Sequence, residues 1–140
     1  DVQAALGLSQ MARLDEFVLK RQAIARRYDH ALADLSLRTP WQHADSYSSY
    51  HLYPIRLKLV EGKQTQRRVY EALHAHGILV NLHYIPVYRQ PYYEALGFKE
   101  GYCPEAEQYF REALSIPMYP AMSDSQVDEV TRHMRETLDV

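Results

Sequence analysis

The chain has little of several features that would narrow its function at once. It contains one cysteine, Cys103, five glycines in 140 residues, and no apolar run near the ~18 residues that span a bilayer. A single cysteine excludes an intrachain disulfide and a multi-cysteine zinc site, and it suits the reducing cytoplasm, where we expect the protein to work. The formal net charge of -2 excludes a strongly basic arm. We therefore expect neither a membrane nor a nucleic-acid partner.

Common catalytic motifs are also missing from the sequence. It has no glycine-rich phosphate loop, no Gly-x-Ser-x-Gly elbow and no motif of paired carboxylates. His74 and His76 are two residues apart in a segment with helical spacing, so they should point to different faces of a helix. Such a pair is a poor set of metal ligands, and we expect no metal site.

The sequence does have ordinary globular composition, with 46% hydrophobic residues, and clear apolar periodicity. Spacings of three and four predict one long amphipathic helix from about residue 11 to residue 35 and further helices over residues 64–76, 91–96 and 104–114. Gly77 and Gly97 stand where helices commonly end. Ser123 and Gln126 have the spacing of a capping box, which predicts a closing helix with an apolar stripe of Val127, Val130, Met134 and Leu138.

Extended segments are expected between these helices. The second half of residues 48–59 alternates apolar and polar side chains, residues 78–84 read as a second strand, and the prolines in 115–120 favour extended or turn backbone. Pro54 lacks an N–H, so its strand should lie at a sheet edge or turn that position away from its neighbour. The fold class is therefore α+β, a small and mostly antiparallel sheet covered by helices.

Residues 81–93 are the one concentrated group of candidate functional side chains. Tyrosines, His83 and Arg89 gather there after a predicted strand, with flat rings, polar tips and one cation. Such a loop could line a pocket for a polar ring-shaped ligand that carries a phosphate or carboxylate. The same residues could instead cover a sheet edge with their hydroxyls in water, and the side-chain chemistry alone leaves both readings open.

Several motifs, taken in order, carry a family resemblance. They are DVQAALGLSQ at 1–10, RLD at 13–15, RRY at 26–28, SYHLYPI at 49–55, GI at 77–78, HYIPV at 83–87, QPYY at 90–93 and LSIPMYP at 114–120. Together they resemble the C-terminal portion of DegT/StrS-type nucleotide-sugar aminotransferases. The HYIPV block is most similar to the subfamily of UDP-4-amino-4,6-dideoxy-N-acetyl-altrosamine transaminases of pseudaminic acid biosynthesis.

The resemblance implies the small C-terminal domain of a fold-type I enzyme that depends on pyridoxal 5'-phosphate and works as a homodimer. Such an enzyme moves an amino group from glutamate to a UDP-4-keto-6-deoxy sugar, a precursor of surface glycans. We expect residues 1–36 to form a long helix that links to a large domain outside this chain, and residues 37–140 to form the small domain.

The same resemblance implies which residues act and which are missing. None of the four lysines, at positions 20, 58, 63 and 99, lies in a pattern like the family's cofactor lysine. We therefore expect no catalytic residue here, cofactor contacts mainly in the large domain, and no activity from the chain alone. The expected substrate-binding residues are His83 and Tyr84, then Asn81 and Arg89. Two other functions stay open, a non-catalytic adaptor that binds sugar nucleotides and a dimerisation module.

Overall fold

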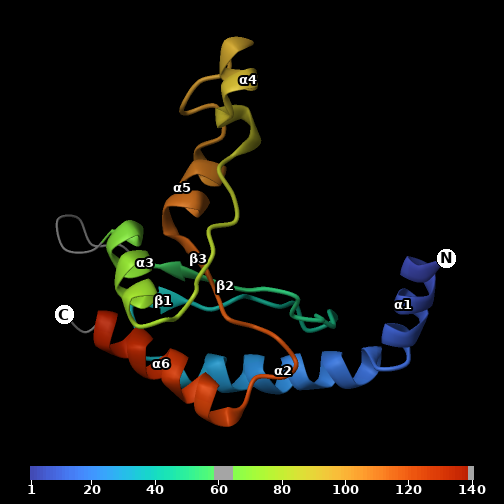
Figure 1. Cartoon of the computed structure of the whole chain (residues 1–140). Coiled ribbons are helices and arrows are strands. Elements are labelled where there is room, and N and C mark those ends of the chain that lie inside the picture. The colour runs from blue at the N-terminus through green and yellow to red at the C-terminus, as the bar shows by residue number, and fades with distance from the viewer. Residues whose placement is uncertain (59–64, 139–140) are drawn as a thin grey trace.

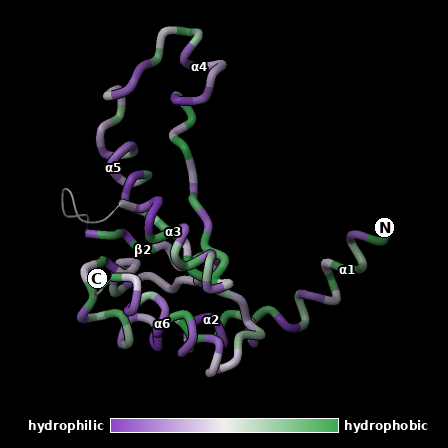
Figure 2. The backbone as a smooth tube through the Cα atoms, turned by 60° about the vertical axis from the view of Figure 1, so that its left-hand side comes forward, coloured by the Kyte–Doolittle hydropathy of each residue, from purple (hydrophilic) through white to green (hydrophobic). Residues whose placement is uncertain are grey.

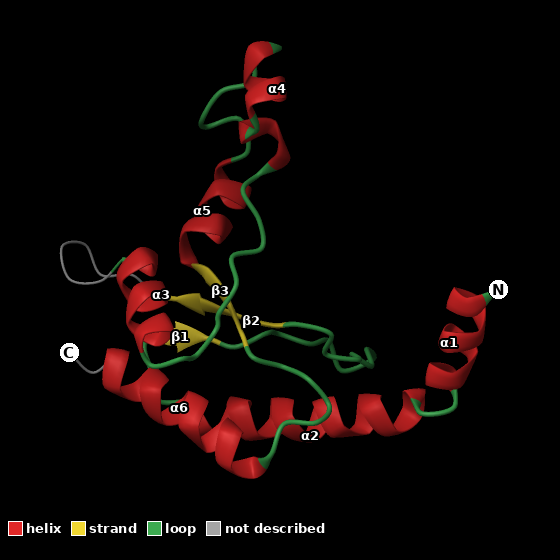
Figure 3. Ribbon diagram, viewed as in Figure 1, coloured by secondary structure: helices red, strands yellow, loops and turns green. Residues whose placement is uncertain are grey.

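The computed structural model describes residues 1–58 and 65–138 and has an α+β fold, as predicted (Figures 1 and 3). The described elements, in chain order, are α1 (Val2–Met11), α2 (Leu14–Ala31), β1 (Leu37–Arg38), β2 (Tyr53–Leu57), α3 (Gln66–Ala75), the 3-10 helix η1 (Val87–Arg89), α4 (Pro91–Ala95), α5 (Pro104–Glu112), β3 (Ala113–Ile116) and α6 (Asp124–Leu138). Leu59 and Gln64, at the ends of a predicted strand and helix, lie outside the described residues.

The three strands form one antiparallel sheet in the order β1-β2-β3. Leu37 pairs with Leu57, and Ile55 pairs with Leu114. The strand that contains Pro54 is therefore central and not at the edge. Because β1 pairs only with Arg56 and Leu57, β2 has a strand partner on one side alone at Pro54, and the missing N–H interrupts no pairing with β1.

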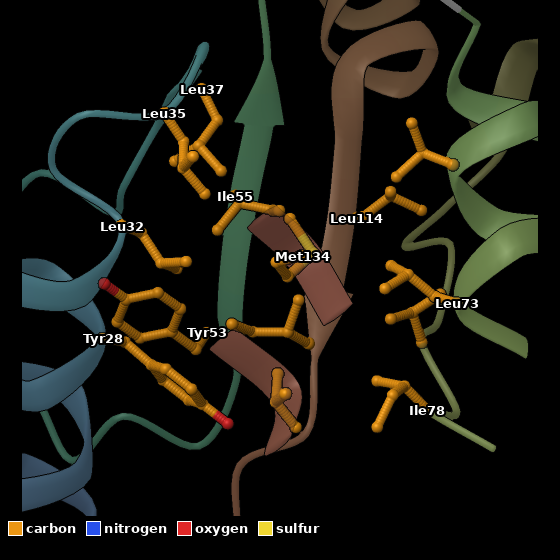
Figure 4. Packing of buried hydrophobic residues seen from close by; sticks show 14 of the residues in the cluster. Tyr28, Leu32, Leu35, Leu37, Tyr53, Ile55, Leu73, Ile78, Leu114 and Met134 are labelled. Atoms are coloured by element: carbon orange, nitrogen blue, oxygen red, sulfur yellow. The ribbon is translucent and has the colours of Figure 1, made fainter. Parts of the chain in front are cut away.

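One hydrophobic core lies between the sheet and the helices. Alternate residues of β2, namely Tyr53, Ile55 and Leu57, are buried on one face. Figure 4 shows Tyr28 of α2 beside Tyr53, where the two rings lie 5.1 Å apart. The core is completed by buried residues of α3, β3 and α6, among them Leu73, Leu114, Val127, Val130 and Met134. In Figure 1, α2 and α6 run beneath the sheet, and α3 stands beside it.

The predicted helix ends are confirmed where local chemistry defines them. Gly77 has φ of 76°, and the amides of Gly77 and Ile78 bond back to the carbonyls of His74 and Leu73. At the start of α6, the Ser123 amide donates to Gln126 Oε1 at 2.9 Å, and the Gln126 amide donates to Ser123 Oγ at 3.3 Å. These reciprocal bonds form the expected capping box.

Residues 1–36, expected as one long helix, form two helices. The helix breaks at Arg13, whose φ of -112° and ψ of 5° are not helical, and α2 ends at Ala31. Apolar spacing cannot reveal this break because both helices have the same period. The side chains of α1 are exposed, and Figure 1 shows this helix standing away from the body of the molecule.

The strand predicted over residues 78–84 is wrong, apart from one isolated bridge between Asn81 and Ser115. The His74 ring Nε2 contacts the Val80 carbonyl at 3.1 Å, which occupies a group that a strand ladder would use. The helix predicted over 104–114 ends at Glu112 because Ala113 and Leu114 pair with β2. Tertiary pairing overrides the helical spacing there.

Residues 84–112 project from the sheet as an extension that we call the arm. It includes η1, α4 and α5, and Figure 1 places α4 far from the sheet. Figure 2, which colours the backbone by hydropathy, shows hydrophobic stretches on both α1 and the arm. Exposed apolar or aromatic side chains are frequent there, namely those of Val2, Leu6, Leu8, Met11, Tyr84, Ile85, Val87, Tyr92, Leu96 and Tyr102. Across residues 1–58 and 65–138, no helix combines the length and apolar character needed to cross a membrane.

Candidate functional site

The candidate site is the segment 81–84, which is anchored to the third strand. The Asn81 amide donates to the Ser115 carbonyl at 3.0 Å, and the Ser115 amide donates to the Asn81 carbonyl at 2.8 Å. Ser115 is only 5% exposed and lies in the middle of a strand whose four residues are all buried. A rigid sheet residue therefore fixes the backbone from which the predicted site residues project.

His83 is tied to the same serine by its side chain. Its Nδ1 lies 2.8 Å from Ser115 Oγ, and its ring lies edge-on to Tyr84, with centroids 4.7 Å apart. Tyr84 is 74% exposed. Ser115 is not among the site residues predicted from the sequence. The signal for it is a hydroxyl side chain between the apolar Leu114 and Ile116, because a buried hydroxyl needs a hydrogen-bond partner. The structure thus brings Asn81, His83 and Tyr84 into one segment.

Two hollows lie along this segment. One has a volume of about 420 Å³ and is lined by Leu79, Asn81 and residues that follow β3, including Met118 and Tyr119. The other measures about 480 Å³ and is lined by Ile85, Pro86 and residues of the arm. Of the predicted site residues, Asn81 lines the first hollow and Arg89 lines the second, whereas His83 and Tyr84 lie on the chain between them.

Arg89 belongs to a different cluster, within the arm. Its guanidinium lies 2.9 Å from Glu94 and 3.4 Å from Glu100. The hydrogen bond to Glu94 raises the pKa of Arg89 above its usual value. The second hollow contains these three residues together with Glu107 and Arg111. An anion that enters this hollow must therefore compete with carboxylates that already hold Arg89.

The arm is held together by a carboxylate on α5. Glu107 accepts hydrogen bonds from the Tyr88 hydroxyl and from the Gly101 amide, the latter at 2.7 Å. The bond from Tyr88, followed by the Gly101 amide, lowers the pKa of Glu107 despite its burial. The Tyr88 hydroxyl also contacts the backbone of Cys103, which precedes α5. These bonds join the outgoing and returning limbs of the arm.

His74 of α3 and His76, the residue that caps the end of this helix, contact different elements, as their spacing predicts. The His74 ring stacks on Tyr70 at 4.1 Å, while the His76 ring stacks on His133 of α6 at 4.2 Å. Among the described residues, no group of three or more His, Cys, Asp or Glu side chains is arranged to hold a metal ion.

The three lysines that the structure describes do not fit a covalently bound aldehyde cofactor. Such chemistry uses a lysine amine that is free to attack a carbonyl in a shielded site. Lys20 pairs with Glu16 at 2.6 Å and is more than half exposed. Lys58 and Lys99 are exposed as well. The part of the chain that the structure describes therefore offers no site that fits pyridoxal 5'-phosphate held through a lysine.

Comparison with known proteins identifies the family to which this fold belongs. Residues 1–135 match the DegT/DnrJ/EryC1/StrS aminotransferase family, and the chain belongs to this family.

Two named relatives are similar over nearly the whole chain. The spore coat polysaccharide biosynthesis protein SpsC of Bacillus subtilis is 39% identical over 97% of this chain and 36% of its own length. The UDP-4-amino-4,6-dideoxy-N-acetyl-beta-L-altrosamine transaminase of Helicobacter pylori is 30% identical over 99% of this chain and 37% of its own length.

A solved structure of an aminotransferase has the same fold as this chain. Helicobacter pylori PseC, an aminotransferase involved in the biosynthesis of pseudoaminic acid, superposes with a TM-score of 0.89. It is 28% identical and covers 99% of this chain and 37% of its own. The chain thus spans little more than a third of the length of these relatives.

Proposed function

We propose that this chain is the C-terminal, substrate-facing part of a nucleotide-sugar aminotransferase that depends on pyridoxal 5'-phosphate. The observation that carries the proposal is the continuous match to one aminotransferase family over residues 1–135. Agreement of fold with PseC over 99% of the chain supports it. In this proposal residues 1–36 lead from a large domain, and residues 37–140 form the small domain of a cytoplasmic homodimer.

The reaction that we propose is transfer of the amino group of glutamate to a UDP-4-keto-6-deoxy sugar, with 2-oxoglutarate as the second product. The product would be an amino-sugar precursor of pseudaminic acid or a related surface glycan. Relatives named for spore coat polysaccharide biosynthesis and for transamination of a UDP-linked sugar support this substrate class. Pyridoxal 5'-phosphate carries amino groups in such reactions.

This chain's own part in the reaction is to bind and orient the sugar nucleotide. His83 and Tyr84 present two ring systems with polar atoms beside each other, and Asn81 fixes the segment to β3. Neutral hydrogen-bond donors suit the diphosphate and hydroxyl oxygens of a sugar nucleotide. Arg89 would join them only after exchanging a carboxylate partner for the substrate anion, because Glu94 and Glu100 hold it here.

The proposal is tested by assaying the full-length protein with glutamate, pyridoxal 5'-phosphate and a UDP-4-keto-6-deoxy sugar. The sugar product is identified from its mass by mass spectrometry. We expect a UDP-amino sugar from the full-length protein and none from residues 1–140 alone. Binding of the UDP-sugar without amino transfer would contradict the proposal and favour the adaptor. Amino transfer by residues 1–140 alone would also contradict it, because the chain is expected to lack the cofactor lysine.

A further inference from the structure

We propose that Ser115 is a positioning residue that holds His83 in the tautomer with its proton on Nε2, so that the ring offers an N–H donor to an oxygen of the substrate diphosphate. The identity of that oxygen rests on the proposed function. The tautomer itself rests only on the contacts of Ser115 and His83.

Burial of Ser115 decides the direction of the hydrogen bond. The backbone N–H and carbonyl of Ser115 are both hydrogen-bonded to Asn81, and Ser115 is 5% exposed. Within residues 1–58 and 65–138, the Ser115 hydroxyl has one hydrogen-bond partner, His83 Nδ1, at 2.8 Å. A hydroxyl has one proton to donate, and a buried donor without an acceptor is costly.

Two arrangements of protons are compatible with this distance. If Nδ1 carried the ring proton, it would donate to Ser115 Oγ, and the hydroxyl proton would be left without an acceptor among the described residues. If Nδ1 is unprotonated, the Ser115 hydroxyl donates to it, and both groups are satisfied. The second arrangement places the proton of the neutral ring on Nε2.

The Nε2–H then has no partner among the described residues and remains available for a ligand. Tyr84 stands edge-on to the ring, and its side chain is largely exposed. The segment therefore presents the imidazole N–H and the phenol O–H as neighbouring donors. Acceptor oxygens on a diphosphate are the chemical class that such donors recognise.

The tautomer is measured directly by nitrogen NMR of the full-length protein labelled with 15N histidine. The His83 signals are identified by their absence in His83→Gln. We expect a protonated Nε2 and an unprotonated Nδ1 when the ring is neutral, and a mixture of the two tautomers in Ser115→Ala. A protonated Nδ1 in the unsubstituted protein would overturn the inference whatever the activity.

Kinetics of two substitutions at His83 provide a readout that loss of structure alone would not produce. The longer amide side chain in His83→Gln would reach the position of Nε2, whereas the shorter amide in His83→Asn would reach only that of Nδ1. We expect His83→Gln to keep a KM for the UDP-sugar within about threefold of the unsubstituted enzyme and His83→Asn to raise it about tenfold. Equal KM values for the two variants would overturn the inference.

Ser115→Ala should raise the KM for the UDP-sugar about three- to tenfold with kcat within about twofold, and Ser115→Thr, which keeps the hydroxyl, should restore the lower KM. No recovery with Ser115→Thr, when the variant is folded by circular dichroism, would count against a hydroxyl role. An unchanged KM in His83→Ala would contradict the proposed contact between His83 and the substrate, but it would not affect the tautomer measurement. Failure of the substrate contact and failure of the tautomer assignment are therefore distinguishable.

Discussion

The hydroxyl of Tyr88 donates a hydrogen bond to the carboxylate of Glu107, nineteen residues further along the chain. The same carboxylate accepts the amide of Gly101 at 2.7 Å. One acidic side chain therefore connects η1, the turn before α5 and α5 itself. We therefore expect the charge of Glu107 to contribute to the stability of the arm.

Substitution of Glu107 by glutamine should loosen the arm. The charge-assisted bonds weaken, so we expect the Gly101 amide to exchange with solvent roughly five- to tenfold faster. Exchange is measured by NMR or mass spectrometry. Glu105→Gln is the matched control, because Glu105 lies on the same helix and is exposed. Equal acceleration in both variants would contradict this role of Glu107.

The protection of Gly101 should also depend on pH. The pKa of Glu107 is lowered from its ordinary value of 4.5 by the Tyr88 bond and the Gly101 amide. A carboxyl group whose pKa is lowered by folding stabilises the fold at pH values above its pKa in the unfolded chain. This stabilisation is lost as the pH falls through its pKa in the folded protein. We therefore expect Gly101 protection to be constant above about pH 5 and to decline below 4.5. In Glu107→Gln this decline should be absent.

Tyr28 should make the protein sensitive to alkali. Its hydroxyl donates to the Pro117 carbonyl at 2.9 Å, and burial, reinforced by Tyr119, raises its pKa above the ordinary value of 10.0. Because the pKa of Tyr28 is raised by folding, its contribution to stability is fully present below pH 10.0. It decreases as the pH rises toward the pKa of Tyr28 in the folded protein. We expect Tyr28→Phe to cost about 0.5–1.5 kcal/mol at neutral pH.

Above pH 10.0, the free energy of unfolding should fall less steeply with pH in Tyr28→Phe than in the unsubstituted protein. The slopes should differ by up to about 1.4 kcal/mol per pH unit. Urea unfolding at several pH values measures both effects. The exposed Tyr47 provides the control, Tyr47→Phe, which should change neither. A slope equal to that of the unsubstituted protein would contradict the role of the buried Tyr28 hydroxyl.

Leu114 tests the packing of β3. It is 0% exposed and pairs with Ile55 of β2, and Figure 4 shows it directed toward α3. Leu114→Ala should lower the free energy of unfolding by about 2–5 kcal/mol through lost burial and a residual cavity. Leu79→Ala, at an exposed leucine, should change it by less than about 0.5 kcal/mol. Similar losses in both would contradict the assigned core.

Local patterns predicted the features that local chemistry determines. The Ser123 capping box, the positive φ of Gly77 and the stripe through Val127, Val130 and Met134 all occur as the spacing indicates. Each depends on neighbours within four residues. The α+β class followed from the same signals, because helices and short extended segments alternate along the chain.

The errors arose where distant residues decide. Residues 78–84 have strand-like composition, but His74 takes the Val80 carbonyl, and β3 offers only Ser115 as a partner. The break at Arg13 leaves helical periodicity unchanged on both sides. At the candidate site, His83 and Tyr84 came from motif resemblance, whereas Ser115, thirty-two residues beyond His83, emerged only from the fold.

The most direct test of the account is kcat/KM for the UDP-sugar in the full-length enzyme carrying Tyr84→Phe, compared with Tyr92→Phe. These two tyrosines are almost equally exposed, at 74% and 71%, but only Tyr84 adjoins His83. If the segment 81–84 binds the sugar nucleotide, Tyr84→Phe should lower kcat/KM about tenfold or more, because a hydrogen bond to a charged group is lost. Tyr92→Phe should stay within about twofold. An unchanged kcat/KM in Tyr84→Phe would contradict the assignment of this segment to the substrate site.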